Sequence, residues 1–359
     1  MTFSQHILCF AQTLRGGGVE RAMLALARQW CAAGRRVTLL IGDGGGPLAA
    51  EVPAAADARM LGDGRYGALP GAIAAAVRAD APDMIFCPGN HYTGAAALAR
   101  LRLGRGCPPI VAKISNALVR PEMGAIAAWG YRRWLRAHPR FLAHVVAMSP
   151  AMAAEAVAEL RIAAERVSVI ANPPPRPPAD APPVPLPPGR FLLGVGRLEP
   201  QKRWDRLIDA MARIADPQVS LLILGEGGAR AALEAQVARL GLAARVRMPG
   251  YAADPGPALA RAEAAVLTSD FEGVPGVLRE ALALGTPVVA TEASVAVREI
   301  VDTPDKGEVV PRGDADALLA ALERRLAPGA ARPEPVAAPG DPAADYLALF
   351  DRIAAQRSA

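Results

Sequence analysis

The stretch from Asp270 to Thr291, DFEGVPGVLREALALGTPVVAT, contains the local pattern that decides the fold. It begins with a loop rich in Gly and Pro, and its periodicity then predicts a helix over 277–284 and an apolar strand over 287–290. The apolar run 264–267, which has the length of a buried strand, comes directly before it. Strand, helix and strand in this order are typical of the units that build a parallel sheet.

The same alternation of short apolar runs and helical segments extends along both halves of the chain. In the first half it predicts a helix over 19–33 and strands over 6–10, 36–41, 83–87, 109–114 and 144–148. In the second half it predicts strands over 190–195, 219–224 and 245–248, with helices over 204–214 and 230–240. The expected fold class is therefore α/β, with two doubly wound parallel-sheet domains in tandem.

A proline-rich segment separates the two halves. Between Asn172 and Gly189 ten of eighteen residues are proline, which excludes a helix or a central strand there. We therefore expect an N-terminal domain over 1–172, a linker over 173–189 and a C-terminal domain over 190–340. A final helix within 341–359 is expected to pack back onto the first domain.

Composition excludes several classes of protein. Hydrophobic residues make up 52% of the 359 residues and charged residues 21%, so the chain is not intrinsically disordered. It shows neither a run of about eighteen apolar residues nor a secretion signal, and a cytoplasmic protein is expected. Four cysteines stand far apart without zinc-ligand spacing and are interpreted as reduced core residues: Cys9, Cys31, Cys87 and Cys107.

Positive charge is concentrated between Arg100 and Arg140. Nine Arg or Lys residues face one Glu there, or +8, although the whole chain has a formal net charge of +5. Within 120–140, aromatic and basic residues alternate: Trp129, Tyr131, Arg132, Arg133, Trp134 and Arg136. One hypothesis is peripheral docking of 120–140 on the anionic inner membrane, and the alternative is a half-buried helix with a solvated arginine face. No zinc-finger, RRM or KH signature is present, so no nucleic-acid partner is expected.

Two glutamates in the opening stretch point to a ligand site. Glu272 lies in the Gly/Pro loop, and Glu280 follows eight positions later inside the helix. The backbone N–H groups at the helix start, near Val277 and Leu278, can donate to anionic oxygens such as phosphate. Glu280 is unsuited to phosphate, and we assign it to the hydroxyls of a ribose.

With these motifs the chain resembles glycosyltransferase family 4. The resemblance covers most of the sequence and is carried by four segments: GGVER at 17–21, GVGRLEPQKRWDRLI at 194–208, LGEG at 224–227 and the paired-glutamate stretch. It implies the GT-B architecture, with two facing Rossmann-like domains around a central cleft. It also implies transfer of a sugar from a nucleotide donor with retention of configuration.

The resemblance also implies roles for individual donor-side residues. Arg197 and Lys202 would hold the donor diphosphate, Glu272 would contact the transferred sugar, and Glu280 would hold the ribose. Gly273 is also expected to contribute to donor binding. Gly17 and Gly18, which follow Gly16, would let the first domain approach the donor. A uridine diphosphate sugar is the expected donor.

No metal cofactor is expected, because two fixed cations can stabilise the departing diphosphate. Asp314 and Asp316 are interpreted as the N-cap and a first-turn carboxylate of a late helix rather than as a metal motif.

The acceptor side of the predicted site is formed by two loop residues. His91 directly follows a predicted strand, where it could orient or deprotonate an acceptor hydroxyl, and it could equally be structural. Many relatives have a Thr-x-His pattern after the next strand, but this chain has KISN at 113–116, ending in Asn116. Asn116 can donate a hydrogen bond but cannot act as a base. The expected acceptor is a glycan or lipid-linked molecule in cell-surface polysaccharide synthesis.

Parts of the sequence are similar to the motifs of other functions. A nicotinamide oxidoreductase is disfavoured because Arg21 replaces the third glycine of the dinucleotide fingerprint, and a P-loop NTPase lacks its Gly-Lys-Ser/Thr ending. A nucleotide-sugar epimerase, a phosphorylase of the same fold and a non-catalytic nucleotide-sugar binding protein remain open.

Overall fold

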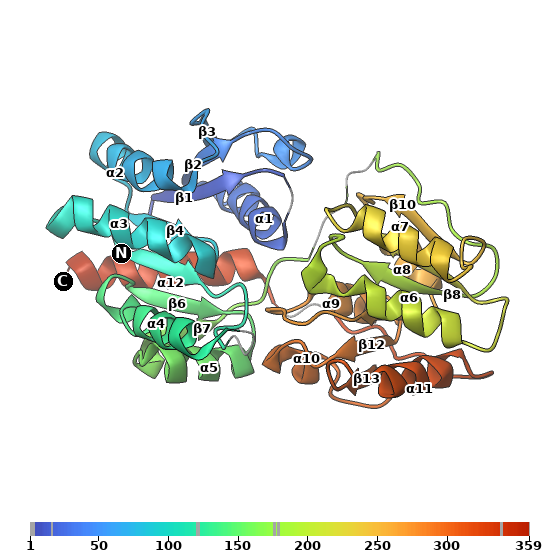
Figure 1. Cartoon of the computed structure of the whole chain (residues 1–359). Helices are drawn as coiled ribbons and strands as arrows, with labels where there is room; N and C mark the ends of the chain where they lie inside the picture. The colour runs from blue at the N-terminus through green and yellow to red at the C-terminus, as the bar shows by residue number, and fades with distance from the viewer. Residues whose placement is uncertain are drawn as a thin grey trace. The chain divides into compact units, whose positions relative to one another are not determined.

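The computed structural model describes residues 4–15, 17–119, 123–174, 177, 180–337 and 340–358. The chain divides into two compact units, shown in Figure 1. Unit 1 comprises Met1–Pro175 with Pro339–Ala359, and unit 2 comprises Arg176–Ala338. Each unit contains one parallel sheet, which confirms the predicted α/β class.

The sheet of unit 1 has seven strands in the order β3-β2-β1-β4-β5-β6-β7. Their bounds are β1 His6–Thr13, β2 Arg36–Asp43, β3 Asp57–Met60, β4 Met84–Cys87, β5 Ile110–Lys113, β6 His144–Ala147 and β7 Val167–Val169. All neighbouring strands are parallel. The strand order reverses between β1 and β4, and open parallel sheets bind ligands at the carboxyl ends of the strands on either side of such a point.

The helices of unit 1 include the C-terminal helix of the chain, drawn in red among the blue and green elements of unit 1 in Figure 1. The helices are α1 Gly18–Ala32, α2 Leu69–Asp80, α3 Thr93–Leu103, α4 Ala125–Leu135, α5 Pro150–Leu160 and α12 Pro342–Ser358. Trp30 of α1 packs edge-to-face on Tyr346 and Phe350 of α12, with ring centroids 5.8 and 5.4 Å apart. Arg35 pairs with Asp351 at 2.8 Å. Helix α12 therefore contributes to the core of unit 1.

Unit 2 repeats the strand order of unit 1 with six strands, β10-β9-β8-β11-β12-β13. The strands are β8 Phe191–Val195, β9 Ser220–Leu224, β10 Val246–Gly250, β11 Ala264–Leu267, β12 Val288–Thr291 and β13 Gly307–Val310. The helices are α6 Trp204–Arg213, α7 Arg230–Arg239, α8 Gly256–Arg261, α9 Gly276–Ala283, α10 Val295–Ile300 and α11 Ala315–Leu326. The reversal of strand order here lies between β8 and β11.

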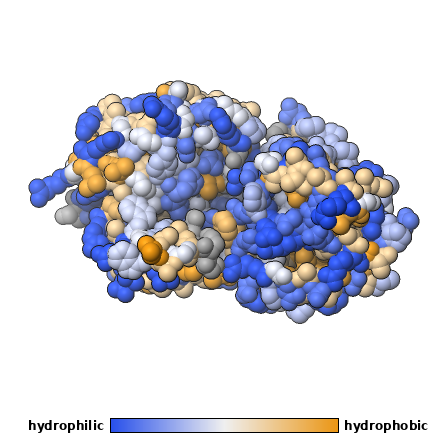
Figure 2. All heavy atoms as spheres, viewed as in Figure 1, coloured by the Kyte–Doolittle hydropathy of each residue, from blue (hydrophilic) through white to orange (hydrophobic). Residues whose placement is uncertain are grey.

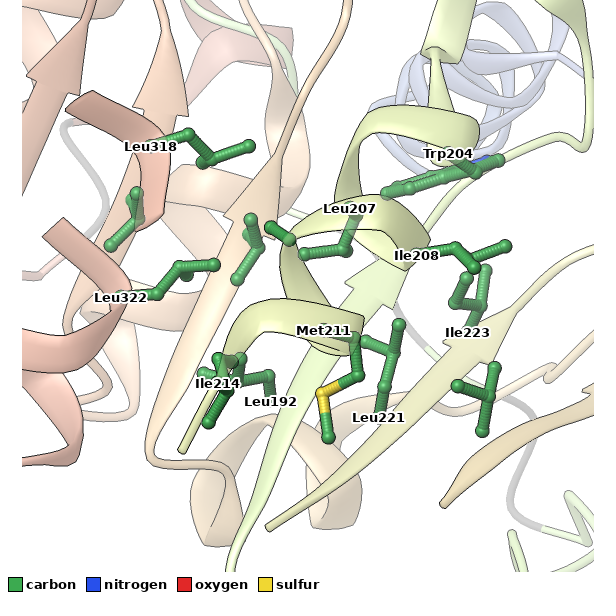
Figure 3. Packing of buried hydrophobic residues seen from close by; sticks show 14 of the residues in the cluster. Leu192, Trp204, Leu207, Ile208, Met211, Ile214, Leu221, Ile223, Leu318 and Leu322 are labelled. Atoms are coloured by element: carbon green, nitrogen blue, oxygen red, sulfur yellow. The ribbon is translucent and has the colours of Figure 1, made fainter. Parts of the chain in front are cut away.

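The core of unit 2 holds a loop of the candidate site in place. Figure 3 shows Leu207 and Met211 of α6 among apolar side chains of β8, β9 and α11. Trp204, at the start of α6, is 1% exposed, and its indole N–H donates to the Arg197 carbonyl at 3.0 Å. Because that indole is anchored in the core, the backbone that follows β8 is fixed in position.

Each strand and helix predicted above overlaps one in the structure. Several elements were not predicted, such as the short strands β3 and β7 and the helix α2. Asp314 caps α11 as expected, since its carboxylate accepts from the Ala317 N–H at 2.8 Å. All four cysteines are free, and Cys31 is only half-buried, unlike the other three. In the proline-rich segment, the described residues 173–174, 177 and 180–189 contain neither helix nor strand.

Candidate functional site

The predicted donor residues of unit 2 gather where its strand order reverses. Arg197 and Lys202 follow β8, and Glu272 follows β11, the neighbouring strand in the sheet. The carboxyl ends of adjacent parallel strands meet at one edge of a sheet, so residues separated by seventy positions become neighbours.

Lys202 and Glu272 form an ion pair. The Lys202 ammonium lies 2.7 Å from Glu272 Oε1, and the two side chains are 16% and 12% exposed. The Ser269 hydroxyl donates to the same oxygen at 2.6 Å, a contact that the sequence analysis did not predict. In the same loop, the Gly273 carbonyl accepts from the Ser294 hydroxyl at 2.6 Å. The pair is thus held in a defined position, and removing one partner leaves a largely buried charge uncompensated.

A second set of contacts ties the loop after β8 to the loop after β11. The Asp270 N–H donates to the Gln201 carbonyl at 2.9 Å, and the Gln201 side-chain amide donates to the Phe271 carbonyl at 2.6 Å. The Asp270 carboxylate pairs with Arg203 at 3.2 Å and with Arg206 at 2.7 Å. These contacts fix Lys202 and Glu272 relative to each other because each residue is adjacent to a tied position.

Arg197 differs from Lys202 in its surroundings. Its side chain is exposed, and within the described part of the chain no carboxylate pairs with its guanidinium. Its loop lies against the next turn: a Cβ on Gly225, whose φ is 157°, would lie 1.9 Å from the Gly196 carbonyl oxygen. Only glycine allows this approach of two backbones. Arg197 is therefore an available cation on a fixed loop.

The start of α9 agrees with the prediction in part. Val277 lies in the first turn as expected, but the Leu278 N–H is not free, because it donates to the Pro275 carbonyl at 3.2 Å. Glu280 is half-buried, with its Oε1 3.2 Å from where a Cβ on Gly276 would lie. The carboxylate thus lies over the first turn of the helix.

In unit 1, His91 lies beside a carboxylate to which no role was assigned. Glu20, on the first turn of α1, accepts a hydrogen bond from the Tyr92 hydroxyl at 2.8 Å. Its Oε1 is 3.8 Å from His91 Nε2, and the His91 side chain is 49% exposed while that of Glu20 is 13% exposed. Burial lowers the pKa of His91, and the nearby Glu20 carboxylate opposes that effect. The sequence signal for Glu20 was its place in the GGVER motif.

Gly17, directly before α1, makes space for a side chain within unit 1. Gly17 has extended backbone with φ 165°, which any residue can adopt. A Cβ there would lie only 2.4 Å from Glu20 Oε2, whereas a Cβ on Gly18 would meet nothing within 4 Å. The missing side chain of Gly17 therefore makes room for the Glu20 carboxylate. Gly16 lies outside the described residues.

Asn116 is part of a tight turn held by Asn90, which the sequence analysis did not identify. The Asn90 side-chain oxygen accepts from the Ser115 N–H at 2.6 Å and the Asn116 N–H at 3.1 Å, and its amide donates to the Asn116 carbonyl at 2.8 Å. The Asn116 side-chain oxygen accepts from the Ala117 N–H at 2.9 Å. Its –NH₂ group is the part of this side chain suited to donating to a ligand.

Lys113 does not belong to the basic surface in which its charge was counted. It ends β5, is 1% exposed, and donates to the Asn172 side-chain oxygen at 3.0 Å. Burial lowers the pKa of Lys113 to about 8, and Glu20 opposes that effect. Its position at the carboxyl end of a strand was readable in the sequence, but its burial was not.

Helix α4 presents an exposed face with both apolar and basic side chains, visible at the lower left of Figure 2. Ile126 is 87% and Trp129 64% exposed, and the Arg133 guanidinium lies 5.3 Å from the Trp129 ring centroid. Trp134 was expected among the aromatic and basic residues of the docking segment. It is instead only half-exposed, and its ring stacks on Phe141 with ring centroids 5.7 Å apart. Residues 120–122 of the predicted basic segment lie outside the described residues.

The described residues contain neither a cluster of metal ligands nor a helix that could span a membrane. Across the described ranges, no three His, Cys, Asp or Glu side chains are grouped so that they could hold a metal ion. None of the described helices combines the length and the apolar character needed to cross a bilayer.

Comparisons with known proteins identify relatives of both units. Residues 16–173 match the family described as Glycosyltransferase Family 4, and residues 189–327 match Glycosyl transferases group 1. The lipopolysaccharide core biosynthesis glycosyltransferase LpsE of Rhizobium meliloti is 35% identical over 155 residues, 43% of this chain and 42% of the relative. The phosphatidyl-myo-inositol mannosyltransferase of Mycobacterium leprae is 37% identical over 158 residues, covering 40% and 41%.

The matched part of the chain spans about two fifths of the length of these curated relatives. Among solved structures, Anabaena HepE in complex with UDP and glucose has a TM-score of 0.69 at 22% identity, over 98% of this chain and 95% of HepE. This likeness shows the fold, which is GT-B. Since one family description covers most of unit 1 and the other most of unit 2, the chain contains a Glycosyltransferase Family 4 domain followed by a Glycosyl transferases group 1 domain.

Proposed function

We propose that this protein is a retaining glycosyltransferase that moves a sugar from a UDP-sugar to a hydroxyl of a glycan or lipid-linked acceptor, in synthesis of a cell-surface polysaccharide. The observation that carries the proposal is the Lys202–Glu272 ion pair at the reversal of strand order in unit 2, beside the exposed Arg197. The names of LpsE and the mannosyltransferase support the acceptor class, and the UDP bound to HepE supports the donor class.

In the proposed reaction, Arg197 and Lys202 bind the diphosphate. The bond between the anomeric carbon and the phosphate oxygen breaks, and the acceptor oxygen bonds to that carbon on the same face. The acceptor proton passes to the departing phosphate oxygen. Negative charge grows on the diphosphate during this step, so two fixed cations stabilise the transition state more than the ground state. No metal ion is required for that stabilisation.

Three further residues of unit 2 complete the proposed donor site. Glu272 accepts hydrogen bonds from hydroxyls of the transferred sugar, and the Val277 N–H at the start of α9 donates to a phosphate oxygen. Glu280 accepts from the ribose hydroxyls, as carboxylates do in other nucleotide sites. In this assignment residues 190–340 bind the donor, and residues 1–172, with His91 and Asn116, bind the acceptor.

The first test is a thermal-shift screen against nucleoside diphosphates and nucleotide sugars. A selective ligand raises the unfolding temperature by mass action, and we expect UDP and one UDP-sugar to do so. Products then separate the remaining functions: an epimerase converts the donor alone, a phosphorylase requires inorganic phosphate, and a binding protein releases no UDP. UDP release that depends on an added acceptor supports the proposal, and its absence with every donor contradicts it.

We also propose that α4 docks unit 1 on the cytoplasmic face of an anionic membrane. Ile126, Trp129 and Arg133 follow helical spacing and so share one face, on which exposed apolar and basic groups meet. Residues 123–140 contain no acidic side chain. A face of this kind suits the headgroup region, where rings and arginines insert beside anionic lipids.

Flotation with phosphatidylglycerol-containing liposomes tests this docking. Replacement of Arg132, Arg133 and Arg136 by Gln should abolish salt-sensitive binding. Replacement of three exposed arginines of unit 2, Arg213, Arg239 and Arg247, serves as the matched control and should leave binding unchanged. Equal binding by both triple variants would rule out α4 as the docking face.

A further inference from the structure

We propose that Glu20 and His91 together bind a hydroxyl of the acceptor, and that Tyr92 and Gly17 are positioning residues for the Glu20 carboxylate. This inference rests on the proposed function and deepens it. It identifies a ligand pair at the reversal of strand order in unit 1, where α1 follows β1 and His91 follows β4.

The separation of the two groups suits a bridging hydroxyl. Glu20 Oε1 and His91 Nε2 are 3.8 Å apart, too far for a direct hydrogen bond. A hydroxyl oxygen at about 2.8 Å from each atom can donate its proton to the carboxylate and accept from the imidazole N–H. His91 is half-exposed, so an acceptor can reach it. Among the described residues, none hydrogen-bonds to a ring nitrogen of His91.

The carboxylate is held rigidly by Tyr92. This tyrosine is 1% exposed, and its ring packs edge-to-face on Phe10 of β1 with centroids 5.7 Å apart. Its hydroxyl accepts from the Gln12 N–H at 2.9 Å and donates to Glu20 at 2.8 Å. Burial raises the pKa of Tyr92, which keeps its hydroxyl protonated as a donor. The direction of the Glu20 carboxylate is therefore set by β1 and the core.

Gly17 provides independent support for a defined position of the Glu20 carboxylate. Its backbone does not require glycine, yet a Cβ would come within 2.4 Å of Glu20 Oε2. A methyl group at position 17 would thus displace the carboxylate from its contact with Tyr92. The glycine is explained by the position of the Glu20 side chain and not by backbone strain.

The charge of the pair selects a neutral ligand. Lys113, the cation of β5 that acts electrostatically on Glu20, is buried and bonded to Asn172. A phosphate placed against the Glu20 carboxylate would be repelled, whereas a sugar hydroxyl can donate to it. The ligand class is therefore an alcohol of a sugar or polyol.

An NMR titration of His91 tests the pairing without requiring turnover. The chain has four histidines, and His91→Gln assigns the resonance. The other titratable groups near the pair are Tyr66 of the turn η2 (Tyr66–Ala68), Tyr92, Cys87 of β4 and Lys113 of β5. Glu20→Gln removes a charge that raises the pKa of His91, so that pKa should fall by about half a pH unit or more. Glu51→Gln, at a surface ion pair with Arg21, is the control and should change nothing.

Steady-state kinetics then tests the role. With UDP-glucose as donor and octyl glycosides of glucose, galactose and N-acetylglucosamine as acceptors, Glu20→Gln should raise the acceptor KM about tenfold or more. The KM for UDP-glucose should stay within about twofold, and Tyr92→Phe should give a smaller rise in acceptor KM. A general loss of folding would change the acceptor KM and the UDP-glucose KM together. A rise in the acceptor KM alone therefore identifies a role in acceptor binding.

Two results would overturn the inference: an unchanged His91 pKa in Glu20→Gln, or a shifted pKa with a wild-type acceptor KM. Failure of the proposed function has a different signature. In that case the wild-type protein gains no thermal stability from any UDP-sugar, which is a property of unit 2, and the His91 titration still decides whether the pair exists.

Discussion

Units 1 and 2 share one strand order around their first strand but place different chemistry at the point where that order reverses. In unit 2 the Glu272 carboxylate is neutralised by Lys202 at 2.7 Å, with Arg197 exposed nearby. In unit 1 the Glu20 carboxylate accepts from the neutral Tyr92 hydroxyl. The first arrangement can accept an anion and the second a neutral hydroxyl. The fold fixes where a ligand lies, and a few loop side chains decide which ligand it is.

The largest expected effect comes from removing the cation of unit 2. Lys202→Ala should lower kcat by about 10²–10³-fold, as loss of one donor to a developing negative charge does. Lys306→Ala, which removes a half-buried lysine paired with Asp302, is the matched control and should leave kcat unchanged. Circular dichroism must show both variants folded. Near-normal transfer by a folded Lys202→Ala variant would remove the distinction between the two units.

The second prediction concerns the buried Lys113 of unit 1, which donates to the neutral Asn172 side chain, whereas Lys202 of unit 2 is paired with a carboxylate. Because the pKa of Lys113 falls to about 8 in the folded protein, the folded state binds fewer protons than the unfolded state between about pH 8 and 10. The burial of the charged Lys113 side chain destabilises the folded state most below pH 8, and this destabilisation decreases as the pH rises. The wild-type free energy of unfolding, relative to Lys113→Met, should therefore rise by about 2 kcal/mol from pH 7 to pH 10.

Urea unfolding of both proteins at each pH measures that difference. The difference between the two proteins cancels the contributions of the tyrosines and cysteines that titrate in the same pH range. A pH-independent difference would mean that Lys113 is not buried as a charged group.

The third prediction compares a glycine from each unit. Gly225→Ala forces a Cβ against a backbone carbonyl and should lower the free energy of unfolding by about 1–2 kcal/mol. Gly17→Ala meets only the end of a side chain and should change stability by less than about 0.5 kcal/mol. Its effect should instead be a severalfold rise in acceptor KM. Equal stability losses would indicate that Gly17, like Gly225, is required by the backbone.

Sequence periodicity predicted the sheets well because buried parallel strands are short apolar runs with clear ends. The exposed strand β3, with the sequence DARM over Asp57–Met60, has no such signal and was missed. Lys202 and Glu272 were anticipated as two residues of one site because the resemblance to glycosyltransferase family 4 implied donor-binding roles for both. Their direct contact was not, since it depends on β8 and β11 being neighbours.

The proposed acceptor side was harder to predict. Glu20 and His91 are separated by seventy-one positions and meet only because β1 and β4 are adjacent. Tyr92 and Asn90 flank His91 in the sequence, but nothing in a local pattern distinguishes a tyrosine that anchors a carboxylate from one that fills the core. The buried Lys113 was counted as surface charge for the same reason: burial is a property of the folded chain.

Calorimetric titration of UDP into the wild type, Lys202→Ala and Glu20→Gln tests the division between the two units most directly. UDP carries the diphosphate without the sugar or acceptor. We expect Lys202→Ala to weaken UDP binding about tenfold or more, since a charge-assisted contact is lost, and Glu20→Gln to bind UDP like the wild type. Unchanged affinity in Lys202→Ala, or a comparable loss in Glu20→Gln, would contradict the account.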